Sequence, residues 1–235
     1  MSVSLNVKGL AAGYGRKRVV DGIDLTVEAG SVTLLLGHNG AGKTTFVRSL
    51  FGLIRPDAGT VWLGDNEITG RSPARNVADG FSFVPQGHGV FRTLSVADNL
   101  ELGGFAEDDR TQLPARRDRV FQMFPILAER REQLAGTMSG GQQQMLAIGI
   151  ALMHSPRFLV LDEPSIGLAP NLVEKVMQSV AEINRTMGTT ILIVEQNVKA
   201  SLPIAQHAVV FKTGQKIYDG GPEPLHDHQR LMELF

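Results

Sequence analysis

The sequence predicts an α/β fold in which a parallel-sheet core is interrupted by a helical region. Apolar runs of strand length, such as Val32–Leu36 and residues 158–161, are typical of buried parallel strands, and segments with helical periodicity follow them. Between residues 88 and 156 the strand pattern stops and helical signals dominate. We therefore expect one α/β core with a helical insertion, and no internal repeat.

Signals for individual elements follow the chain in order. In the first third, apolar residues alternate with polar ones at Leu5 and Val7 and again at Ile23, Leu25 and Val27, a pattern typical of half-buried strands. Turn residues separate the elements that come next. We expect further strands at 32–36, 60–63 and 81–84, and a helix over 43–51.

The middle and last parts of the chain carry clear helix signals. A capping box at 95–98 predicts a helix start, a basic amphipathic stretch covers 116–124, and a third helix is expected from near Ser139 to Met153. Strands and helices then alternate again. We expect strands at 158–161, 190–194, 209–212 and 216–218, and helices over 171–187 and 224–234.

Composition excludes several classes of protein. The 23 Lys and Arg residues nearly balance 24 Asp and Glu residues, which argues against a surface built to bind nucleic acid or anionic lipid. The chain has no cysteine, so disulfides and thiolate chemistry are excluded. No apolar run reaches the roughly 18 residues that a membrane span needs, and the N-terminus lacks a secretory pattern. We expect a soluble, cytoplasmic protein that can dock on a membrane protein.

A glycine-rich segment between a predicted strand and helix fits the pattern G-x-x-x-x-G-K-[ST]. Its glycines let backbone N–H groups surround a phosphate at a helix N-terminus, whereas a chance Gly-rich turn would lack this context. Lys43 is expected to reach the β- and γ-phosphates, Thr44 to ligate Mg²⁺, and His38 to lie at the rim. The predicted nucleotide-binding residues are Gly37, His38, Asn39, Gly40, Ala41, Gly42, Lys43, Thr44 and Thr45.

Two acids end the apolar strand at 158–161. Neighbouring residues of a strand point to opposite sides, so Asp162 and Glu163 can serve different purposes. Asp162 is suited to the Mg²⁺ shell and Glu163 to polarising an attacking water. A solvated strand end is the alternative, and the phosphate-binding loop disfavours it.

A second anion site is predicted where Ser139, Gly140, Gly141 and Gln142 open a helix, because exposed N–H groups and a hydroxyl gather there. The alternative is a simple Ser N-cap. The order of the phosphate-binding loop, this Ser-Gly-Gly segment and the acidic strand closely resembles the ATP-binding cassette (ABC) ATPases over essentially the whole chain.

The resemblance implies a fold and an activity. It implies a P-loop NTPase with a RecA-like core and an antiparallel β lobe (residues 1–87 and 157–235) and a helical lobe (88–156) carrying the signature motif. It implies Mg²⁺-dependent hydrolysis of ATP by a dimer with an identical or homologous subunit, which encloses two ATPs. It further implies membrane permease subunits, indirect work with a periplasmic or extracellular solute-binding protein, and a place on the cytoplasmic face of the inner membrane.

The resemblance also assigns single residues. Tyr14 matches the aromatic residue that stacks on adenine, although it could be an ordinary turn tyrosine. Gln86 matches the glutamine that touches Mg²⁺ or water and hinges the helical lobe. Gln196 stands at the switch position, where most relatives have His, and its alternative is to cap the following helix. Residues 165–168 occupy the D-loop without the Asp that many relatives carry.

Four stretches are similar to the LivF-type ATP-binding subunits of branched-chain amino acid importers, although His38 and Ile150 depart from that pattern. Alternatives are an importer of urea, an amide or another amino acid, a non-transport ABC ATPase of DNA repair or translation, and a regulatory binder without hydrolysis. His226 and His228 have the spacing of a metal pair but suit a solvated helix start better, and Met138, Met145 and Met153 suit a core. The four stretches are 133–137, 144–149, 167–170 and 194–197.

Overall fold

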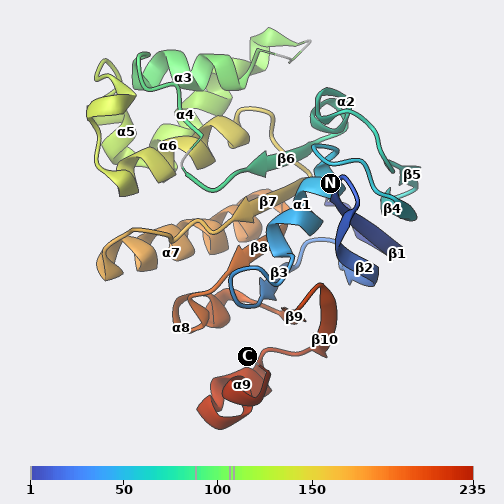
Figure 1. Ribbon diagram of the computed structural model, residues 1–235. Helices are drawn as coiled ribbons and strands as arrows, with labels where there is room; N and C mark the ends of the chain where they lie inside the picture. Colours follow the sequence, from blue (N-terminus) through green and yellow to red (C-terminus); the bar gives the residue numbers. More distant parts are fainter. Residues whose placement is uncertain (1, 88, 106, 108, 235) are drawn as a thin grey trace.

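The computed structural model describes residues 2–87, 89–105, 107 and 109–234. Residue 88, where the sequence places the start of the helical lobe, lies outside this description. Two sheets and several groups of helices make up the fold (Figure 1). The α/β class predicted from the sequence is confirmed.

The smaller sheet is antiparallel and has the strand order β2-β1-β4-β5. Its first two strands are longer than the alternation in the sequence suggested, because they continue to the hairpin in which Tyr14 pairs with Lys17. The strands are β1 (Leu5–Tyr14), β2 (Lys17–Val27), β4 (Ala58–Leu63) and β5 (Asn66–Glu67).

The larger sheet has the order β10-β9-β3-β8-β7-β6. Its strands run parallel except for the antiparallel β9–β10 hairpin at one edge. They are β3 (Val32–Leu36), β6 (Phe81–Val84), β7 (Phe158–Asp162), β8 (Thr190–Glu195), β9 (His207–Lys212) and β10 (Gln215–Gly220). All residues of β3, β7 and β8 are buried, as expected for central strands covered on both faces.

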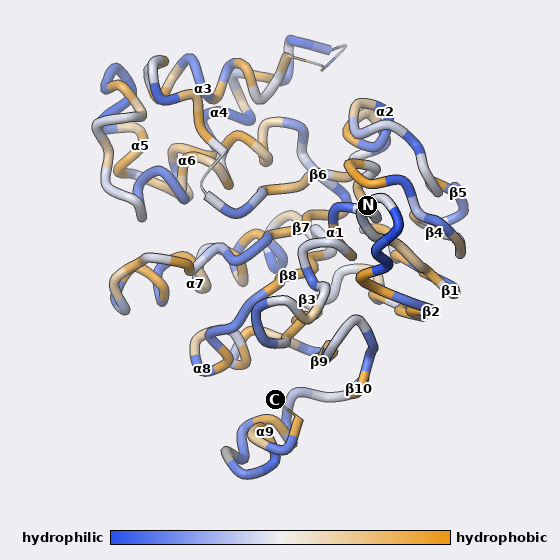
Figure 2. Tube along the Cα trace, viewed as in Figure 1, coloured by the Kyte–Doolittle hydropathy of each residue, from blue (hydrophilic) through white to orange (hydrophobic). Residues whose placement is uncertain are grey.

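The two faces of this sheet belong to two apolar cores. Leu34 packs into a core with the helices of the middle region and α7 (Pro170–Met187), whereas its neighbour Leu35 packs into a core with the small sheet and α1 (Lys43–Phe51). In the second core the rings of Phe46 and Phe211 meet edge to face at 5.1 Å. Figure 2 shows hydrophobic residues along the central strands and hydrophilic ones in the connecting loops.

The helices of the middle region form a separate group, at the upper left in Figure 1. Ser95 caps the first of them, since its hydroxyl accepts a hydrogen bond from the Asp98 N–H at 3.0 Å, and the predicted capping box is confirmed. These helices are α3 (Val96–Gly103), α4 (Leu113–Met123), α5 (Pro125–Glu129) and α6 (Gly140–Leu152).

Three details differ from expectation. The terminal helix is broken: a 3₁₀ turn over Glu223–His226 precedes α9 (His228–Leu234), because the extended Asp227 between them accepts a hydrogen bond from the Arg230 N–H and starts a new helix. Pro125 begins α5 as well as ending the previous helix. The short helices α2 (Pro73–Ala78) and α8 (Val198–Ser201) were not expected.

The remaining expectations concern single side chains and the membrane. Met138, Met145 and Met153 are buried, as predicted. His226 is exposed, and the residues that the structure describes hold no group of three or more potential metal ligands. Within the same residues, no helix is both long and apolar enough to cross a bilayer.

Candidate active site

The phosphate-binding loop connects the buried end of β3 to the start of α1. Two of its glycines are required by close packing. A Cβ atom at Gly37 would lie 2.4 Å from the Phe211 carbonyl oxygen, and one at Gly42 would lie 2.7 Å from a Val20 methyl group. Gly42 also adopts φ 98° as the N-cap of α1. The loop is therefore held between the small sheet and β9, with the N-terminus of α1 directed into it.

The loop borders a cavity of about 170 Å³. The cavity gathers most of the residues that the sequence assigns to nucleotide binding, and it adds two of the three predicted catalytic side chains, Gln86 and Glu163. The lining residues are Val19, His38, Asn39, Gly40, Ala41, Gly42, Lys43, Thr44, Thr45, Gln86 and Glu163.

Lys43 is buried at the base of this cavity. Its Nζ donates hydrogen bonds to the carbonyl oxygens of Gly37 at 2.7 Å and His38 at 3.2 Å, and it lies 3.7 Å from Glu163 Oε1. Burial lowers the pKa of Lys43, and the negative charges of Glu163 and Asp162 oppose this shift only in part. The phosphate-binding loop thus positions Lys43, which is predicted to contact the phosphates that this loop binds.

Asp162, the last residue of β7, faces Thr44. Its Oδ1 accepts a hydrogen bond from the Thr44 hydroxyl at 3.3 Å, while its Oδ2 is buried without a hydrogen-bond partner. Burial, and then the charge of Glu163, raise the pKa of Asp162 to about 6. A buried carboxylate oxygen beside a threonine hydroxyl is the donor set that Mg²⁺ uses in phosphate sites. The residues present therefore fit the metal predicted from the sequence.

The backbone at Glu163 turns out of the strand, whereas the sequence predicted that the strand would continue through this residue. It lies beyond the end of β7 in a left-handed conformation, with φ 51°, and its N–H donates to the Val194 carbonyl oxygen at 2.9 Å. The different environments of Glu163 and Asp162 thus come from this turn, not from alternation along a strand. The left-handed backbone is a strained conformation for a non-glycine residue, and such strain is common at functional sites.

Two glutamine amides hold the Glu163 carboxylate. Gln86 Nε2 donates to Oε2 at 2.9 Å, and Gln196 Nε2 donates to Oε1 at 2.7 Å. Gln196 Nε2 also donates to Asn39 Oδ1 at 2.7 Å. The three side chains that the sequence nominated for catalysis are therefore in direct contact, although they come from segments far apart in the chain.

The side chains on either side of Gln196 form hydrogen bonds with other parts of the backbone. Asn197 caps α8, where its Oδ1 accepts a hydrogen bond from the Ala200 N–H. Glu195 is buried, and its carboxylate accepts hydrogen bonds from the backbone N–H groups of Ser165, Gln196 and Asn197. Sequence reasoning missed this connection between the switch segment and residues 165–168. The available signal was an acid directly after the apolar run 191–194, because an acid buried at the end of such a run needs partners.

The Ser-Gly-Gly segment does not line this cavity. Ser139 caps α6 and forms a capping box with Gln142, so the predicted N-terminal geometry is present. Ser139 and Gly140 are exposed, whereas Gly141 packs against Leu172 so closely that a Cβ would lie 2.7 Å from its Cδ1. In Figure 1 α6 belongs to the helical group and α1 to the sheet core. The predicted anion site at the start of α6 is therefore not part of the cavity at the chain's own phosphate loop.

Tyr14 also lies outside the cavity. It is 53% exposed at the end of β1, and Lys17 is its partner across the hairpin. The first strand pair thus presents an aromatic ring to solvent, which suits a stacking role and an ordinary turn equally.

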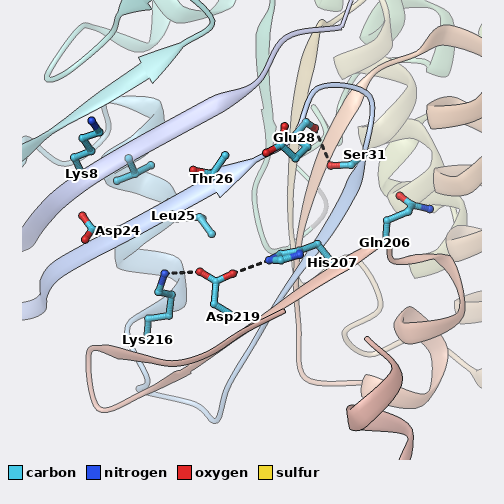
Figure 3. Close-up of a pocket in the computed structure, with 11 residues that line it drawn as sticks. Lys8, Asp24, Leu25, Thr26, Glu28, Ser31, Gln206, His207, Lys216 and Asp219 are labelled. Atoms are coloured by element: carbon cyan, nitrogen blue, oxygen red, sulfur yellow. Dashed lines mark hydrogen bonds and ion pairs between the residues drawn. The ribbon is translucent and has the colours of Figure 1, made fainter. Parts of the chain in front are cut away.

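A second hollow, of about 560 Å³, lies between the small sheet and the β9–β10 hairpin (Figure 3). Its central polar groups are already paired: Asp219 accepts hydrogen bonds from Lys216 and, at 2.6 Å, contacts His207 Nε2. Gln206 accepts from the Val32 N–H, and Asp24 accepts from the Gly9 N–H. Since these groups already have hydrogen-bond partners within the protein, the smaller cavity at the phosphate loop is the better candidate for the site.

Comparisons with known proteins relate the whole chain to transporter ATP-binding proteins. A family model described as "ABC transporter" matches residues 20–166. The chain is 39% identical over 202 residues to the high-affinity branched-chain amino acid transport ATP-binding protein BraG of Pseudomonas aeruginosa, covering 86% of each protein. It is 33% identical to a probable branched-chain amino acid transport ATP-binding protein LivF of Archaeoglobus fulgidus, covering 96% of this chain and 95% of that one.

Two further similarities extend over nearly the whole chain. The lipopolysaccharide export system ATP-binding protein LptB of Escherichia coli K12 is 31% identical, with 99% of this chain and 96% of that protein covered. The solved ADP conformation of MJ1267, an ATP-binding cassette of an ABC transporter, superimposes with a TM-score of 0.86 at 27% identity, with 99% and 98% covered.

Proposed function

Because the chain belongs to the ABC transporter family and is an ATPase subunit of that family, we propose that it energises the uptake of branched-chain amino acids by a membrane importer. It binds ATP with Mg²⁺ and hydrolyses it. The names of BraG and LivF support the proposed solute, and their identities exceed or match that of the other relatives described above. LptB, at 31% identity, favours a second candidate, a transporter of a different solute.

The observation that carries the hydrolytic part of the proposal is the position of Glu163. Its carboxylate lines the phosphate cavity, 3.7 Å from Lys43 Nζ and within hydrogen-bond distance of Gln86 and Gln196. We assign to Glu163 the acceptance of a proton from the attacking water and to Lys43 the binding of the β- and γ-phosphates. To Gln196 we assign the orientation of the Glu163 carboxylate, to which its amide donates a hydrogen bond.

The metal would be held by Asp162 and Thr44, with Gln86 at the edge of its shell. When bound, Mg²⁺ neutralises charge on the phosphate oxygens. The chain's own contribution is to present a buried Asp162 oxygen that has no other partner. Tyr14, on the exposed end of the hairpin, is proposed to stack on the adenine ring.

The exposed start of α6 supports a shared active site. Ser139, Gly140 and Gly141 offer N–H groups and a hydroxyl, but they do not line the cavity of their own chain. We assign them to the nucleotide bound by a second, identical or homologous, subunit. Two such subunits would close on two ATP molecules, and the closed state would be favoured by its better contacts to ATP.

A hollow of about 250 Å³ beside Pro85 supports docking on a permease. It separates the sheet core from the helical group, and its apolar lining includes Phe83, Leu102 and Ile150, of which Leu102 is 41% exposed. Gln86 follows Pro85 directly, so a permease segment in this hollow would act on the residue that contacts Glu163. Through this contact we place the chain at the cytoplasmic face of the inner membrane, with a solute-binding protein as an indirect partner.

Isolation from native membranes tests the proposal. The tagged chain should co-purify with permease subunits, and vesicles containing that assembly should take up leucine, isoleucine and valine when ATP is supplied. An assembly carrying Glu163→Gln should bind the same subunits and fail to transport. Uptake of urea, an amide or another solute in place of these amino acids would overturn the solute assignment, and an ATPase found without any membrane subunit would overturn the transport role.

A further inference from the structure

The amide group of Gln196 has two acceptors at once. Its Nε2 lies 2.7 Å from Glu163 Oε1 and 2.7 Å from Asn39 Oδ1. A primary amide carries two hydrogens on one nitrogen, so each acceptor can receive one of them. Asn39 belongs to the phosphate-binding loop and Gln196 to the segment after β8, so this pair of contacts joins the loop to the base through a single side chain.

These two hydrogen bonds also determine the orientation of the Gln196 amide group. The two oxygen acceptors require the nitrogen of the amide to face the cavity, because the opposite orientation would place the Gln196 oxygen against two other oxygens. With Asn39 absent, only the contact to Glu163 would resist rotation about the last torsion of Gln196, which is a broad one. The Asn39 carbonyl therefore limits the orientations of the donor that faces Glu163.

We propose that Asn39 is a positioning residue for ATP hydrolysis, whose side-chain carbonyl orients the Gln196 amide toward Glu163. The inference rests on the proposed catalytic roles of Glu163 and Gln196, and it adds a side-chain function to a loop residue otherwise expected to act through its backbone. It also gives a physical reason for glutamine, and not histidine, at position 196. A neutral imidazole has a single N–H group, so a histidine there could not donate to both acceptors.

Replacement of Asn39 with alanine tests the proposal by steady-state phosphate release and equilibrium binding of Mg-ATP to the purified protein. We expect kcat to fall about three- to tenfold, the range of one neutral hydrogen bond, with a KM for ATP within about twofold of wild type. Asn66→Ala, an exposed asparagine in β5, is the matched control and should leave both constants unchanged.

Two further variants separate positioning from a merely structural role. Asn39→Asp keeps the acceptor, so it should recover most of the kcat lost in Asn39→Ala, while its added negative charge beside the phosphates should raise KM. In a Gln196→Ala background, Asn39→Ala should cause no further loss of kcat, because the residue through which it acts is gone.

Each outcome decides the proposal. Full additivity of the two alanine variants, an unchanged kcat in Asn39→Ala, or a loss that appears only in KM would overturn the positioning role. These results are distinguishable from failure of the catalytic assignment itself. If Glu163→Gln and Gln196→Ala both turn over ATP like wild type, the proposed catalytic roles fail first, whatever Asn39→Ala does.

Discussion

The side-chain amide of Gln196 donates a 2.7 Å hydrogen bond to the Glu163 carboxylate. The two residues follow neighbouring parallel strands, β8 and β7, in which Val194 pairs with Asp162. Because the carboxyl ends of parallel strands meet at one edge of the sheet, the register brings both side chains to the same place, beside the phosphate-binding loop of β3. The contact orients the carboxylate within the cavity that Glu163 lines.

Removal of the Lys43 ammonium should abolish productive ATP binding. Its Nζ is held by two loop carbonyls, and the described lining of the cavity contains no other lysine or arginine. Lys43→Ala therefore leaves the phosphates without a lysine or arginine partner. We expect at least a tenfold weaker affinity for Mg-ATP, measured by equilibrium dialysis, and no measurable turnover. Lys175→Ala, on the exposed face of α7, serves as control and should bind ATP normally. Wild-type affinity in Lys43→Ala would disprove the assignment.

Substitutions of Glu163 and Asp162 should impair different steps, hydrolysis in the first case and Mg²⁺ binding in the second. Glu163→Gln keeps the size of the side chain and removes the proton acceptor, so ATP and Mg²⁺ should bind while hydrolysis falls by about 10² or more. Asp162→Asn removes the charge of the buried oxygen that has no partner, so the Mg²⁺ concentration needed for half-maximal ATP binding should rise. Titration of Mg²⁺ at fixed ATP separates the two. Gel filtration with Mg-ATP should show a dimer for Glu163→Gln, and a wholly monomeric protein at saturating ATP would argue against the shared site.

The sequence was sufficient to predict the core strands and the phosphate-binding loop. Continuous apolar runs marked β3 and β7, and the glycine spacing between β3 and α1 identified the loop, because both signals are local. The proximity of Gln86 to Glu163 is not local, since it depends on how β6 and β7 pair across a long helical insertion. The family resemblance placed Gln86 near the metal or the attacking water, but the contact with Glu163 came from the structure.

The sequence patterns could not predict the backbone turn at Glu163 or the hydrogen-bond partners of Glu195. A left-handed residue directly after a strand has no signature when the residue is not glycine or asparagine. The side chain of Glu195 accepts hydrogen bonds from three backbone N–H groups in two loops. These partners can be identified only when the positions of both loops are known. The broken terminal helix has the same cause, since Asp227 acts as a cap inside a pattern that is helical on both sides.

Gly214 should be intolerant of a side chain. It has φ 80°, and a Cβ there would lie 2.1 Å from the Val19 carbonyl oxygen. Its N–H donates to the Ala41 carbonyl oxygen of the phosphate loop, and its own carbonyl accepts from the Asp21 N–H. We expect Gly214→Ala to lower the free energy of unfolding by about 2 kcal/mol or more, measured by urea unfolding, and to weaken ATP binding as the loop shifts.

Gly188→Ala is the matched control for this effect. Gly188 also has a positive φ, of 68°, as the C-cap of α7, but no atom lies within 4 Å of its Cβ position. It should cost only about 1 kcal/mol, the conformational part of the penalty. Equal losses in the two variants would show that the clash at Val19 does not contribute.

The Asp219 carboxylate should add stability that disappears in acid. Burial by itself would raise its pKa, but hydrogen bonds from Lys216 and His207 outweigh burial and hold the pKa below its usual value. A carboxyl group whose pKa falls on folding stabilises the protein above its unfolded-state pKa of about 4, and this contribution is lost as the pH falls through the folded-state value. Asp219→Asn should therefore reduce the free energy of unfolding at pH 5, and reduce it by less at pH 3.

The size of that effect is limited by solvent. The Asp219 side chain is 35% exposed, so we expect a difference below about 1 kcal/mol from wild type in urea unfolding at pH 5. Asp65→Asn, at an exposed turn, is the control and should show no such pH dependence. A difference between Asp219→Asn and wild type that grows toward pH 3 would contradict the sign of the shift.

Glutamine at position 196 should add no titration of its own to the pH dependence of turnover near neutrality. Gln196→Ala removes the hydrogen bond that orients the Glu163 carboxylate, so kcat should fall by about 10- to 100-fold, the range of one hydrogen bond to a charged group, while ATP affinity changes only a few-fold. Gln196→His should stay active at a reduced rate, because its single neutral N–H cannot serve both Glu163 and Asn39. Its kcat should also change between about pH 6 and 8, where imidazole titrates and an amide does not. Wild-type turnover in Gln196→Ala would remove the residue from the mechanism, and a flat pH profile in Gln196→His would show that the charge of the side chain at this position does not affect the reaction.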